Sequence, residues 1–242
     1  MAIAAAAAIE RHPHLAEHTP AGFVRVDMHS HTMFSGDSTT TLDEIAESVI
    51  EAGIDVLCVT DHNAIEGALR LQRALEGDGV CRVVVGEEVR THTGEIIGLF
   101  LSERIPFGAP ATETARQIRS QGALVYIPHP FDPMRRNLTE ASLEEITAAG
   151  LVDAIEVHNS KTSLQSLNAR AFGFGVEHAL GLGAGSDAHV PHALGSAFVE
   201  MPDFDGPTDF LAKLGEGVLV GHHWDMHRPW SARIVPSVTE EY

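Results

Sequence analysis

Cysteine and long apolar runs are both scarce in this sequence of 242 residues. It contains two cysteines, Cys58 and Cys81, which are too few for a disulfide framework. Both lie in or beside apolar segments, and we therefore expect buried thiols in a reducing cytoplasm. No apolar run approaches the roughly 18 residues that a membrane-spanning helix needs. These shortages argue against a secreted or membrane-embedded protein and favour a cytoplasmic one.

Basic residues are also few, since 16 lysines and arginines stand against 34 aspartates and glutamates and give a formal net charge of −18. Passive binding to a polynucleotide needs rows of Lys and Arg over the phosphates, so this balance argues against long nucleic acid as a partner. It leaves room for bound cations, which can neutralise acidic charge locally.

Hydrophobic residues make up 44% of the chain, enough for the core of one large α/β barrel or of two small domains. Residues 1–9 are mostly alanine and lack the basic segment that begins a secretory signal. Residues 11–20 are typical of a linker, although their histidines, His12, His14 and His18, leave a metal-binding role open. We expect a flexible N-terminal extension over residues 1–22 and a single barrel domain over residues 23–242.

Segments typical of strands and of helices alternate along the chain. Thr41 and Glu44 match the capping box that begins a helix. The apolar patterns predict helices at 41–52, 64–76, 112–121, 139–149, 164–180 and 208–214. They predict strands at 23–26, 54–59, 82–85, 95–101, 123–127, 154–157, 181–185, 197–201 and 218–220, with a hairpin through Thr93-Gly94. Such alternation indicates a parallel barrel or a doubly wound sheet.

The placement of polar residues distinguishes these two architectures. Nearly every predicted strand is followed at its carboxyl end by His, Asp or Glu. In a barrel those ends meet on one face around a central axis, whereas an open sheet would spread them along a line. A site shared by all of them therefore requires a barrel.

The first strand runs into Asp27-Met28-His29-Ser30-His31. Residues two apart in a strand share a face, so His29 and His31 should project together. Two neutral imidazoles held in this way supply half of a divalent metal site. Asp27 is expected to orient one of these rings, and Asp61, which comes directly before His62, is expected to orient a ligand imidazole rather than to bind an ion itself.

Further imidazoles, carboxylates and one amide follow the other strands, and with the first pair they make a large ligand set. Its members are His29, His31, Asp37, Asp61, His62, Glu88, His129, His158, Asn159, Asp187 and His189. This mixture, without clustered thiolates, suits Zn, Mn or Fe, and it is large enough for two or three ions. A water between closely spaced ions is acidified to a hydroxide nucleophile, and the same ions stabilise charge on phosphoryl oxygens.

The order of the motifs resembles the PHP (polymerase and histidinol phosphatase) family of metal-dependent phosphoesterases. The motifs are Asp27-Met28-His29-Ser30-His31, Thr60-Asp61-His62, Gly86-Glu87-Glu88, His129-Pro130, Ile155-Glu156-Val157-His158-Asn159 and Gly185-Ser186-Asp187-Ala188-His189. The resemblance covers roughly residues 24–198. It implies a distorted (β/α)7 barrel with its metal site at the C-terminal ends of the strands.

The resemblance also implies how the ligands are divided. One ion would be held by His29, His31 and Asp187, with Glu88 bridging to a second ion that His129 helps to bind. A third ion would be held by Asp37, His62 and His189. The residues expected to take part in catalysis are His29, His31, Glu88, His129, Asp187 and His189.

The chain departs from the family pattern at one ligand of the second ion. Many members carry a histidine where this sequence has Glu95, so Glu95 is expected to take its place, with His92 as a nearby substitute. A carboxylate at this position would shift the metal preference or lower the affinity.

The substrate-binding residues are expected in the loops that follow the fifth and sixth strands. Arg135 and Arg136 come shortly after His129, and the arginine fork suits bidentate contact with phosphate. The other candidates are His158, Asn159 and Lys161. The arginines could instead pair with surface carboxylates such as Asp132.

The hypothesis that follows is a cytoplasmic, metal-dependent phosphoesterase acting on a small phosphorylated substrate. A nucleotide, histidinol phosphate and a short oligonucleotide all have suitable chemistry. Two alternatives keep the metal site: a metal-dependent barrel amidohydrolase or lactonase, and a non-catalytic metal-binding regulatory domain. His178, His222, His223 and His227 are expected to be ordinary surface or core residues.

Overall fold

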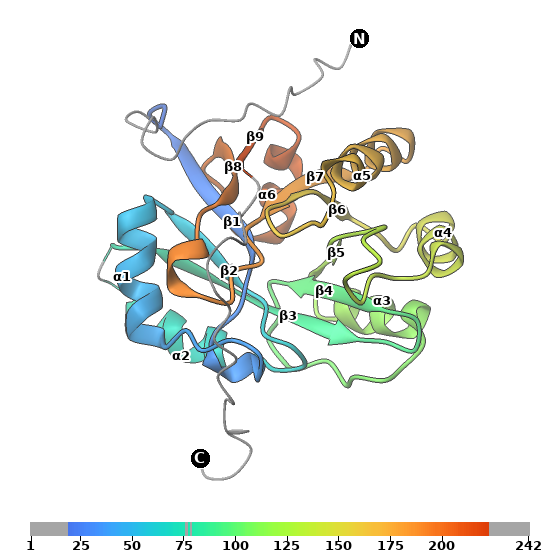
Figure 1. The fold of residues 1–242 in the computed structure, drawn as a ribbon, viewed down its shortest axis with the longest axis horizontal. Helices are drawn as coiled ribbons and strands as arrows, with labels where there is room; N and C mark the ends of the chain where they lie inside the picture. Colours follow the sequence, from blue (N-terminus) through green and yellow to red (C-terminus); the bar gives the residue numbers. More distant parts are fainter. Residues whose placement is uncertain (1–18, 76, 78, 223–242) are drawn as a thin grey trace.

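The computed structural model describes residues 19–75, 77 and 79–222. Its nine strands lie in the order β7-β6-β5-β4-β3-β2-β1-β8-β9, and this sheet curls into a nearly closed barrel (Figure 1). The strands are β1 (Phe23–Ser30), β2 (Val56–Val59), β3 (Arg82–Arg90), β4 (Glu95–Leu99), β5 (Leu124–Ile127), β6 (Ala154–Asn159), β7 (Gly181–Gly185), β8 (Ala197–Pro202) and β9 (Val218–Gly221). The helices are α1 (Leu42–Ala52), α2 (Glu66–Leu75), α3 (Ala111–Ser120), α4 (Glu140–Ala148), α5 (Gln165–Glu177) and α6 (Gly206–Leu214).

Strands β1 to β7 surround the barrel axis. Parallel pairing joins β1 to β2, β2 to β3, β5 to β6 and β6 to β7, while β4 runs antiparallel to both β3 and β5. Beyond β1 the sheet continues antiparallel into β8 and then β9. The prediction of a distorted seven-stranded barrel is confirmed, and the predicted hairpin is where the parallel order is interrupted.

The barrel closes where β1 changes partners halfway along its length. Its first half, up to Val26, pairs with β8, and its second half bonds to the segment after β7. There the N–H of Asp187 donates to the carbonyl of His29 at 2.8 Å, and that of His31 donates to the carbonyl of Ala188 at 3.0 Å. The pairing of β1 with β2 shifts register over the same stretch. The first and last ligand motifs are thereby joined through their backbones.

Glycines in β7 make room for side chains inside the barrel. A Cβ at Gly183 would lie 2.8 Å from the hydroxyl oxygen of Tyr126 and 2.9 Å from Sδ of Met28, both of which are fully buried. A Cβ at Gly185 would lie 2.9 Å from the backbone nitrogen of His29. Strand β7 can therefore approach β1 this closely only without side chains at these two positions.

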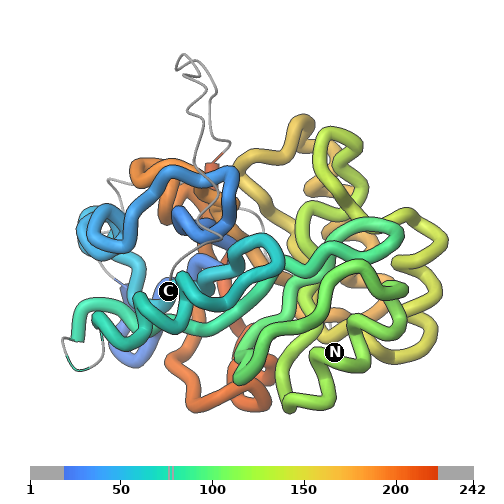
Figure 2. Tube along the Cα trace, turned by 90° about the horizontal axis from the view of Figure 1, so that it is seen from below, coloured from blue at the N-terminus to red at the C-terminus, as the bar shows by residue number. Residues whose placement is uncertain are grey.

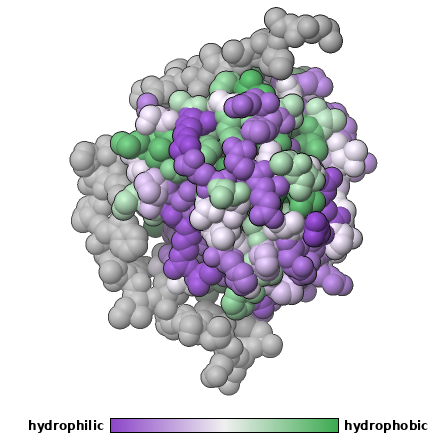
Figure 3. Space-filling model, turned by 90° about the vertical axis from the view of Figure 1, so that its right-hand side faces the viewer, coloured by the Kyte–Doolittle hydropathy of each residue, from purple (hydrophilic) through white to green (hydrophobic). Residues whose placement is uncertain are grey.

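Helices cover the outside of the barrel, with α1 and α2 on one side and α3, α4 and α5 on the other (Figures 1 and 2). The predicted capping box begins α1, since Thr41 and Glu44 exchange side-chain and backbone hydrogen bonds. Ile45 and Val49 form the buried face of this helix. The surface near α3 to α5 is mostly hydrophilic, with small hydrophobic patches, as expected for helix faces in contact with solvent (Figure 3).

The division into an extension over residues 1–22 and one domain over residues 23–242 stays a prediction, because both ends of the chain lie outside the described residues. The predictions for a further set of histidines also stay predictions, because these residues lie outside the described part of the chain: His12, His14, His18, His223 and His227. Both cysteines are free and buried. In the part of the chain that the structure describes, no helix is long and apolar enough to cross a membrane.

Candidate metal centre

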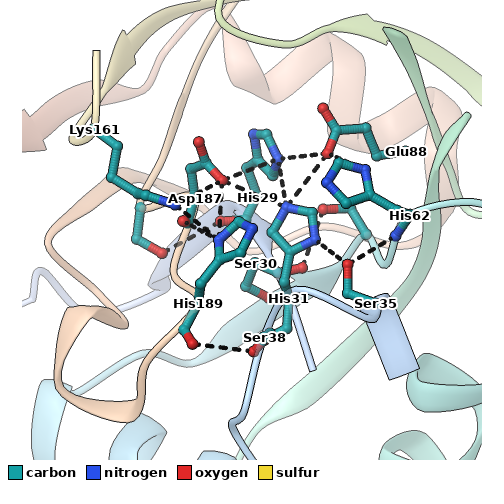
Figure 4. A network of polar contacts seen from close by, with 12 residues as sticks. His29, Ser30, His31, Ser35, Ser38, His62, Glu88, Lys161, Asp187 and His189 are labelled. Carbon is teal, nitrogen blue, oxygen red and sulfur yellow. Dashed lines mark hydrogen bonds and ion pairs between the residues drawn. The ribbon is translucent and has the colours of Figure 1, made fainter. Parts of the chain in front are cut away.

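Side chains from the carboxyl ends of several strands converge at one mouth of the barrel (Figure 4). They form four overlapping groups in which the donor atoms lie within 4.8 Å of one another. The groups are His29–His31–Asp187, His29–Glu88–His129, His62–Glu88–Glu95 and His31–Asp37–His62–His189. The structure therefore brings together all nine residues predicted as metal ligands.

The innermost group combines two histidines of the first motif with the aspartate of the last. Nε2 of His29 and Nε2 of His31 are 3.0 Å apart, and Oδ1 of Asp187 lies 3.8 Å and 3.4 Å from them. Ligands about 2.0–2.1 Å from one tetrahedral zinc ion are separated by about 3.3 Å, so these atoms fit the corners of one site. Two imidazole nitrogens that face each other this closely also need a shared cation or proton between them.

Glu88 lies between this group and the next. Its Oε2 is 3.4 Å from Nε2 of His29 and 3.2 Å from Nδ1 of His62, and its Oε1 is 3.0 Å from Nε2 of His129. Burial would raise the pKa of Glu88, but the surrounding imidazoles of His62, His29 and His129 outweigh burial and hold that pKa well below its usual range. A carboxylate with each oxygen facing a different set of ligands is suited to bridging two ions.

The outermost group lies nearer solvent. Oδ2 of Asp37 is 3.2 Å from Nε2 of His62 and 3.2 Å from Nε2 of His189, and the Asp37 side chain is 49% exposed. Partial burial opposes ionisation of Asp37, but the hydrogen bonds from these rings hold its pKa far below the usual range. Burial lowers the pKa of His62, yet Glu88 and Asp37 raise it overall to about 9.

Glu95, which was expected to take the place of a histidine as a ligand, lies at the start of β4. Its side chain is buried, with Oε1 3.7 Å from Nδ1 of His62. His62 therefore faces Glu88 and Glu95 with one ring nitrogen and Asp37 with the other, and a neutral imidazole can ligate through only one of them. His92, the predicted substitute, is exposed in the turn before β4 and belongs to none of the donor groups among the described residues.

Two residues that the sequence analysis did not assign orient the inner histidines. Glu156 accepts a hydrogen bond from Nδ1 of His29 at 3.1 Å and another from the backbone N–H of His129 at 2.6 Å. Oγ of Ser35 lies 2.9 Å from Nδ1 of His31. Because a carboxylate only accepts, Nδ1 of His29 carries a proton, and in the neutral ring that binds a metal the lone pair is then on Nε2, facing the centre. The signal for Glu156 was a carboxylate inside an apolar parallel strand.

The two aspartates expected to orient imidazoles bond elsewhere. Asp61 accepts from the backbone N–H of Thr32 at 2.6 Å and from its hydroxyl at 2.7 Å. Asp27 accepts from the backbone N–H groups of His29, Ser186 and Gly195. Burial raises the pKa of Asp61 to about 7 and that of Asp27 to about 6. Both carboxylates therefore hold the backbone around the site in place, and the expectation that they orient rings is corrected.

Two residues of β6, His158 and Asn159, were predicted to bind substrate, and a bulge in the strand determines where each of them points. The pairing with β7 shifts register between Glu156 and His158, so these two residues lie on opposite faces of the strand. Asn159 turns inward, with its amide 2.9 Å from Oε2 of Glu156 and 3.4 Å from Oδ2 of Asp187. His158 instead packs against Gly221 of β9, where an added Cβ would lie 2.6 Å from its Nε2.

Two of the three predicted phosphate-binding cations lie at the mouth. A terminal guanidinium nitrogen of Arg135 is 3.6 Å from Oδ2 of Asp187, and Nζ of Lys161 is 3.6 Å from its Oδ1 and 2.8 Å from Nδ1 of His189. Arg136 is exposed, and its backbone carbonyl accepts from Glu95. Burial would raise the pKa of Asp187, but Lys161 and Arg135 outweigh burial and keep that pKa well below its usual range.

Comparison with known proteins agrees with this arrangement. A model of the PHP domain matches residues 27–167, and a model of a PHP-associated region matches residues 165–219. The chain belongs to the PHP family. An uncharacterized protein of Methanocaldococcus jannaschii is 32% identical over 222 residues, which are 87% of this chain and 88% of its own length. A probable phosphatase of Vibrio campbellii is 37% identical over 78 residues, 28% of this chain.

The fold of this PHP protein is also found among solved structures. One is a two-domain protein from Bacteroides vulgatus that contains a predicted PHP-like metal-dependent phosphoesterase. The two chains superpose with a TM-score of 0.59 and 18% identity, covering 75% of this chain and 59% of the other. This likeness shows the fold, while membership of the PHP family supports a hydrolase of the phosphoesterase class.

Proposed function

We propose that this protein is a metal-dependent phosphoesterase that hydrolyses a small phosphorylated substrate, such as a nucleotide, histidinol phosphate or a short oligonucleotide. One observation carries the proposal: four overlapping groups of imidazole and carboxylate donors, each with its donor atoms within 4.8 Å of one another, lie directly beside the cations Arg135 and Lys161. A metal site that adjoins fixed positive charge is suited to an anionic ester.

The donor set fits divalent ions such as Zn, Mn or Fe. His29, His31 and Asp187 would hold one ion, Glu88 would bridge to a second ion with His129 and Glu95, and Asp37, His62 and His189 would hold a third. When bound, these ions supply an activated water and neutralise charge on the phosphoryl oxygens. The residues expected to take part in catalysis would do so by holding these ions. They are His29, His31, Glu88, His129, Asp187 and His189.

The chain's own residues would bind and orient the ester. Arg135 and Lys161 would hold non-bridging phosphoryl oxygens at the edge of the site, and Asn159 would place its amide beside Asp187. Arg136, which is exposed, would contact a larger part of the substrate. His158 packs against β9, so of the five residues predicted to bind substrate it has the weakest structural support.

The proposed location is the cytoplasm, which agrees with two free, buried thiols. The proposed partner is the small phosphorylated substrate. The net charge of −18 argues against long nucleic acid.

The test is hydrolysis of a panel of phosphate esters by protein loaded with Mn²⁺ or Zn²⁺. The panel contains a nucleotide, histidinol phosphate and a short oligonucleotide, alongside a lactone and a cyclic amide. We expect phosphate release and no ring opening. His129→Ala should lower kcat/KM by at least about 100-fold, the upper end of what losing even an outer partner of a metal ligand costs. His178→Ala, at the end of α5 and outside the centre, is the matched control and should match the wild type.

Ring opening without phosphate release would replace the proposal with the amidohydrolase or lactonase alternative. Full metal binding without turnover on any member of the panel would favour the regulatory alternative.

A further inference from the structure

Two loops at the mouth of the barrel each carry one cation of the proposed anion site. The loop between β5 and α4 carries Arg135, and the loop between β6 and α5 carries Lys161. The two cations approach opposite oxygens of Asp187, each at 3.6 Å. A terminal guanidinium nitrogen of Arg135 also donates to the carbonyl of Lys161 at 3.4 Å. The spacing of the two positive charges therefore depends on how the two loops are held together.

Asp132 joins these loops. Its side chain is fully buried, and its Oδ2 accepts from the backbone N–H of Ser163 at 2.8 Å. Its Oδ1 accepts from the hydroxyl of Ser163 at 2.8 Å and from the backbone N–H of Met134 at 3.0 Å. One carboxylate thus bonds across to the second loop and along its own loop, and Arg135 donates its backbone N–H to the carbonyl of Asp132 at 3.0 Å.

The conformation of the first loop is one that the backbone does not adopt readily. His129 and Phe131 have positive φ angles of 27° and 71°, which are unfavourable for residues other than glycine. Such a conformation persists only where surrounding contacts hold it, and the bonds of Asp132 lie directly after it. Asp132, the carboxylate considered as a surface partner for the arginines, is buried and binds Ser163 and Met134, while Arg135 forms its ion pair with Asp187.

We propose that Asp132 is a positioning residue for anion binding, holding Arg135 at the spacing from Lys161 that a phosphoryl group needs. This inference rests on the proposed function. Asp132 belongs to none of the donor groups among the described residues, and it acts through Arg135.

The test is a double-mutant cycle with inorganic phosphate as the probe. Binding of phosphate to the metal-loaded wild type, Asp132→Ala, Arg135→Ala and the double variant is measured by calorimetry. Arg135→Ala should weaken phosphate binding by about 10- to 100-fold, the range for losing a hydrogen bond to a charged group. Asp132→Ala should weaken it by a similar factor. The double variant should bind no more weakly than Arg135→Ala alone, because Asp132 acts through that residue.

Further measurements separate positioning from general loss of stability. Asp153 also accepts a backbone N–H from another strand, that of Val125 at 2.8 Å, but it lies at the opposite end of β6. Asp153→Ala is the matched control and should lower the melting temperature without changing phosphate affinity. Ser163→Ala removes one of the three bonds to Asp132 and should show the same effect as Asp132→Ala to a smaller extent. In steady-state assays the Asp132 variant should raise KM more than it lowers kcat.

The outcomes distinguish this inference from the proposed function. Unchanged phosphate affinity and KM in Asp132→Ala, in an enzyme that still turns over, would overturn the inference and leave the phosphoesterase. Strictly additive effects of the two substitutions would overturn it as well. If the wild type hydrolyses no ester but binds phosphate in the predicted pattern, the phosphoesterase proposal fails and the role of Asp132 stands.

Discussion

Replacing Glu156 with glutamine should weaken metal binding, although the two side chains have almost the same size. In the wild type, one oxygen of Glu156 accepts from Nδ1 of His29, and the other accepts from the backbone N–H of His129 and the amide of Asn159. Glutamine has one oxygen. If that oxygen keeps the two donors from His129 and Asn159, its NH₂ group faces Nδ1 of His29. Nδ1 must then accept, and the ring proton moves to Nε2, where it blocks the lone pair that faces the centre.

The magnitude follows from the role of such outer partners. Loss of a carboxylate that orients a ligand imidazole typically costs 10- to 100-fold in metal affinity, which corresponds to about 1.4–2.8 kcal/mol. His29 belongs to two of the four donor groups, so the effect should extend to more than one ion.

The assay is titration of metal-free protein with Zn²⁺ in competition with a chromophoric chelator, with the imidazole tautomer followed by ¹⁵N NMR. Glu200→Gln is the matched control, because Glu200 lies on β8, away from the centre, and pairs with Arg25. It should bind metal like the wild type. Wild-type affinity in Glu156→Gln, with the proton still on Nδ1 of His29, would refute the reasoning.

Four other results are expected. Because a Cβ at Gly185 would lie 2.9 Å from the backbone of His29, Gly185→Ala should lower the free energy of unfolding in urea. The expected loss is about 3 kcal/mol, at the upper end of overpacking costs. Gly173→Ala, on the exposed side of α5 with open space around it, should instead raise that free energy by up to about 1 kcal/mol. Removal of ions with a chelator should lower the melting temperature reversibly, since an ion present at about 1,000 times its Kd contributes about 4 kcal/mol. Burial would raise the pKa of Asp132, but hydrogen bonds from Ser163 and Met134 lower it overall. The contribution of Asp132 to the free energy of unfolding is therefore present above the unfolded pKa of about 3.9. It is lost as the pH falls through the lower pKa of the folded state. The difference in unfolding free energy between wild type and Asp132→Asn should therefore be constant above about pH 5 and narrow below about pH 4.

The positions of the candidate ligands could be predicted from the sequence because they depend on a simple rule. Residues at the carboxyl ends of parallel strands meet at one mouth of a barrel, whatever the details of packing. His29, Glu88, His129 and Asp187 come from four different strands or the segments just after them, and the rule placed all four at that mouth. Helix boundaries were also predictable where local signals decided them, as at the capping box of Thr41.

The roles of neighbouring residues could not be predicted in this way, because they depend on strand register. Alternation in an ideal strand would place Glu156 and His158 on the same face. The bulge in β6 places one extra residue, Val157, between Glu156 and His158, whose partners Gly183 and Ala184 are adjacent on β7. It turns His158 towards β9 and brings Asn159 inward. A bulge of this kind leaves no distinct pattern in a single sequence, so His158 was expected at the substrate and Glu156 was not assigned.

The glycines of β7 lie against both the predicted ligand His29 and the unassigned Glu156. Gly181, Gly183 and Gly185 alternate along the strand, which was predicted as a short strand at 181–185. In the structure, Gly183 faces Met28 and Tyr126, and Gly185 faces His29 and Glu156. Alternating glycines therefore marked the face of the last strand that lies against crowded barrel residues. A carboxylate in an apolar strand that pairs with such a strand, as Glu156 pairs with Gly183, should be interpreted as a residue inside the barrel. That rule places Glu156 inside the barrel, on the side where His29 lies.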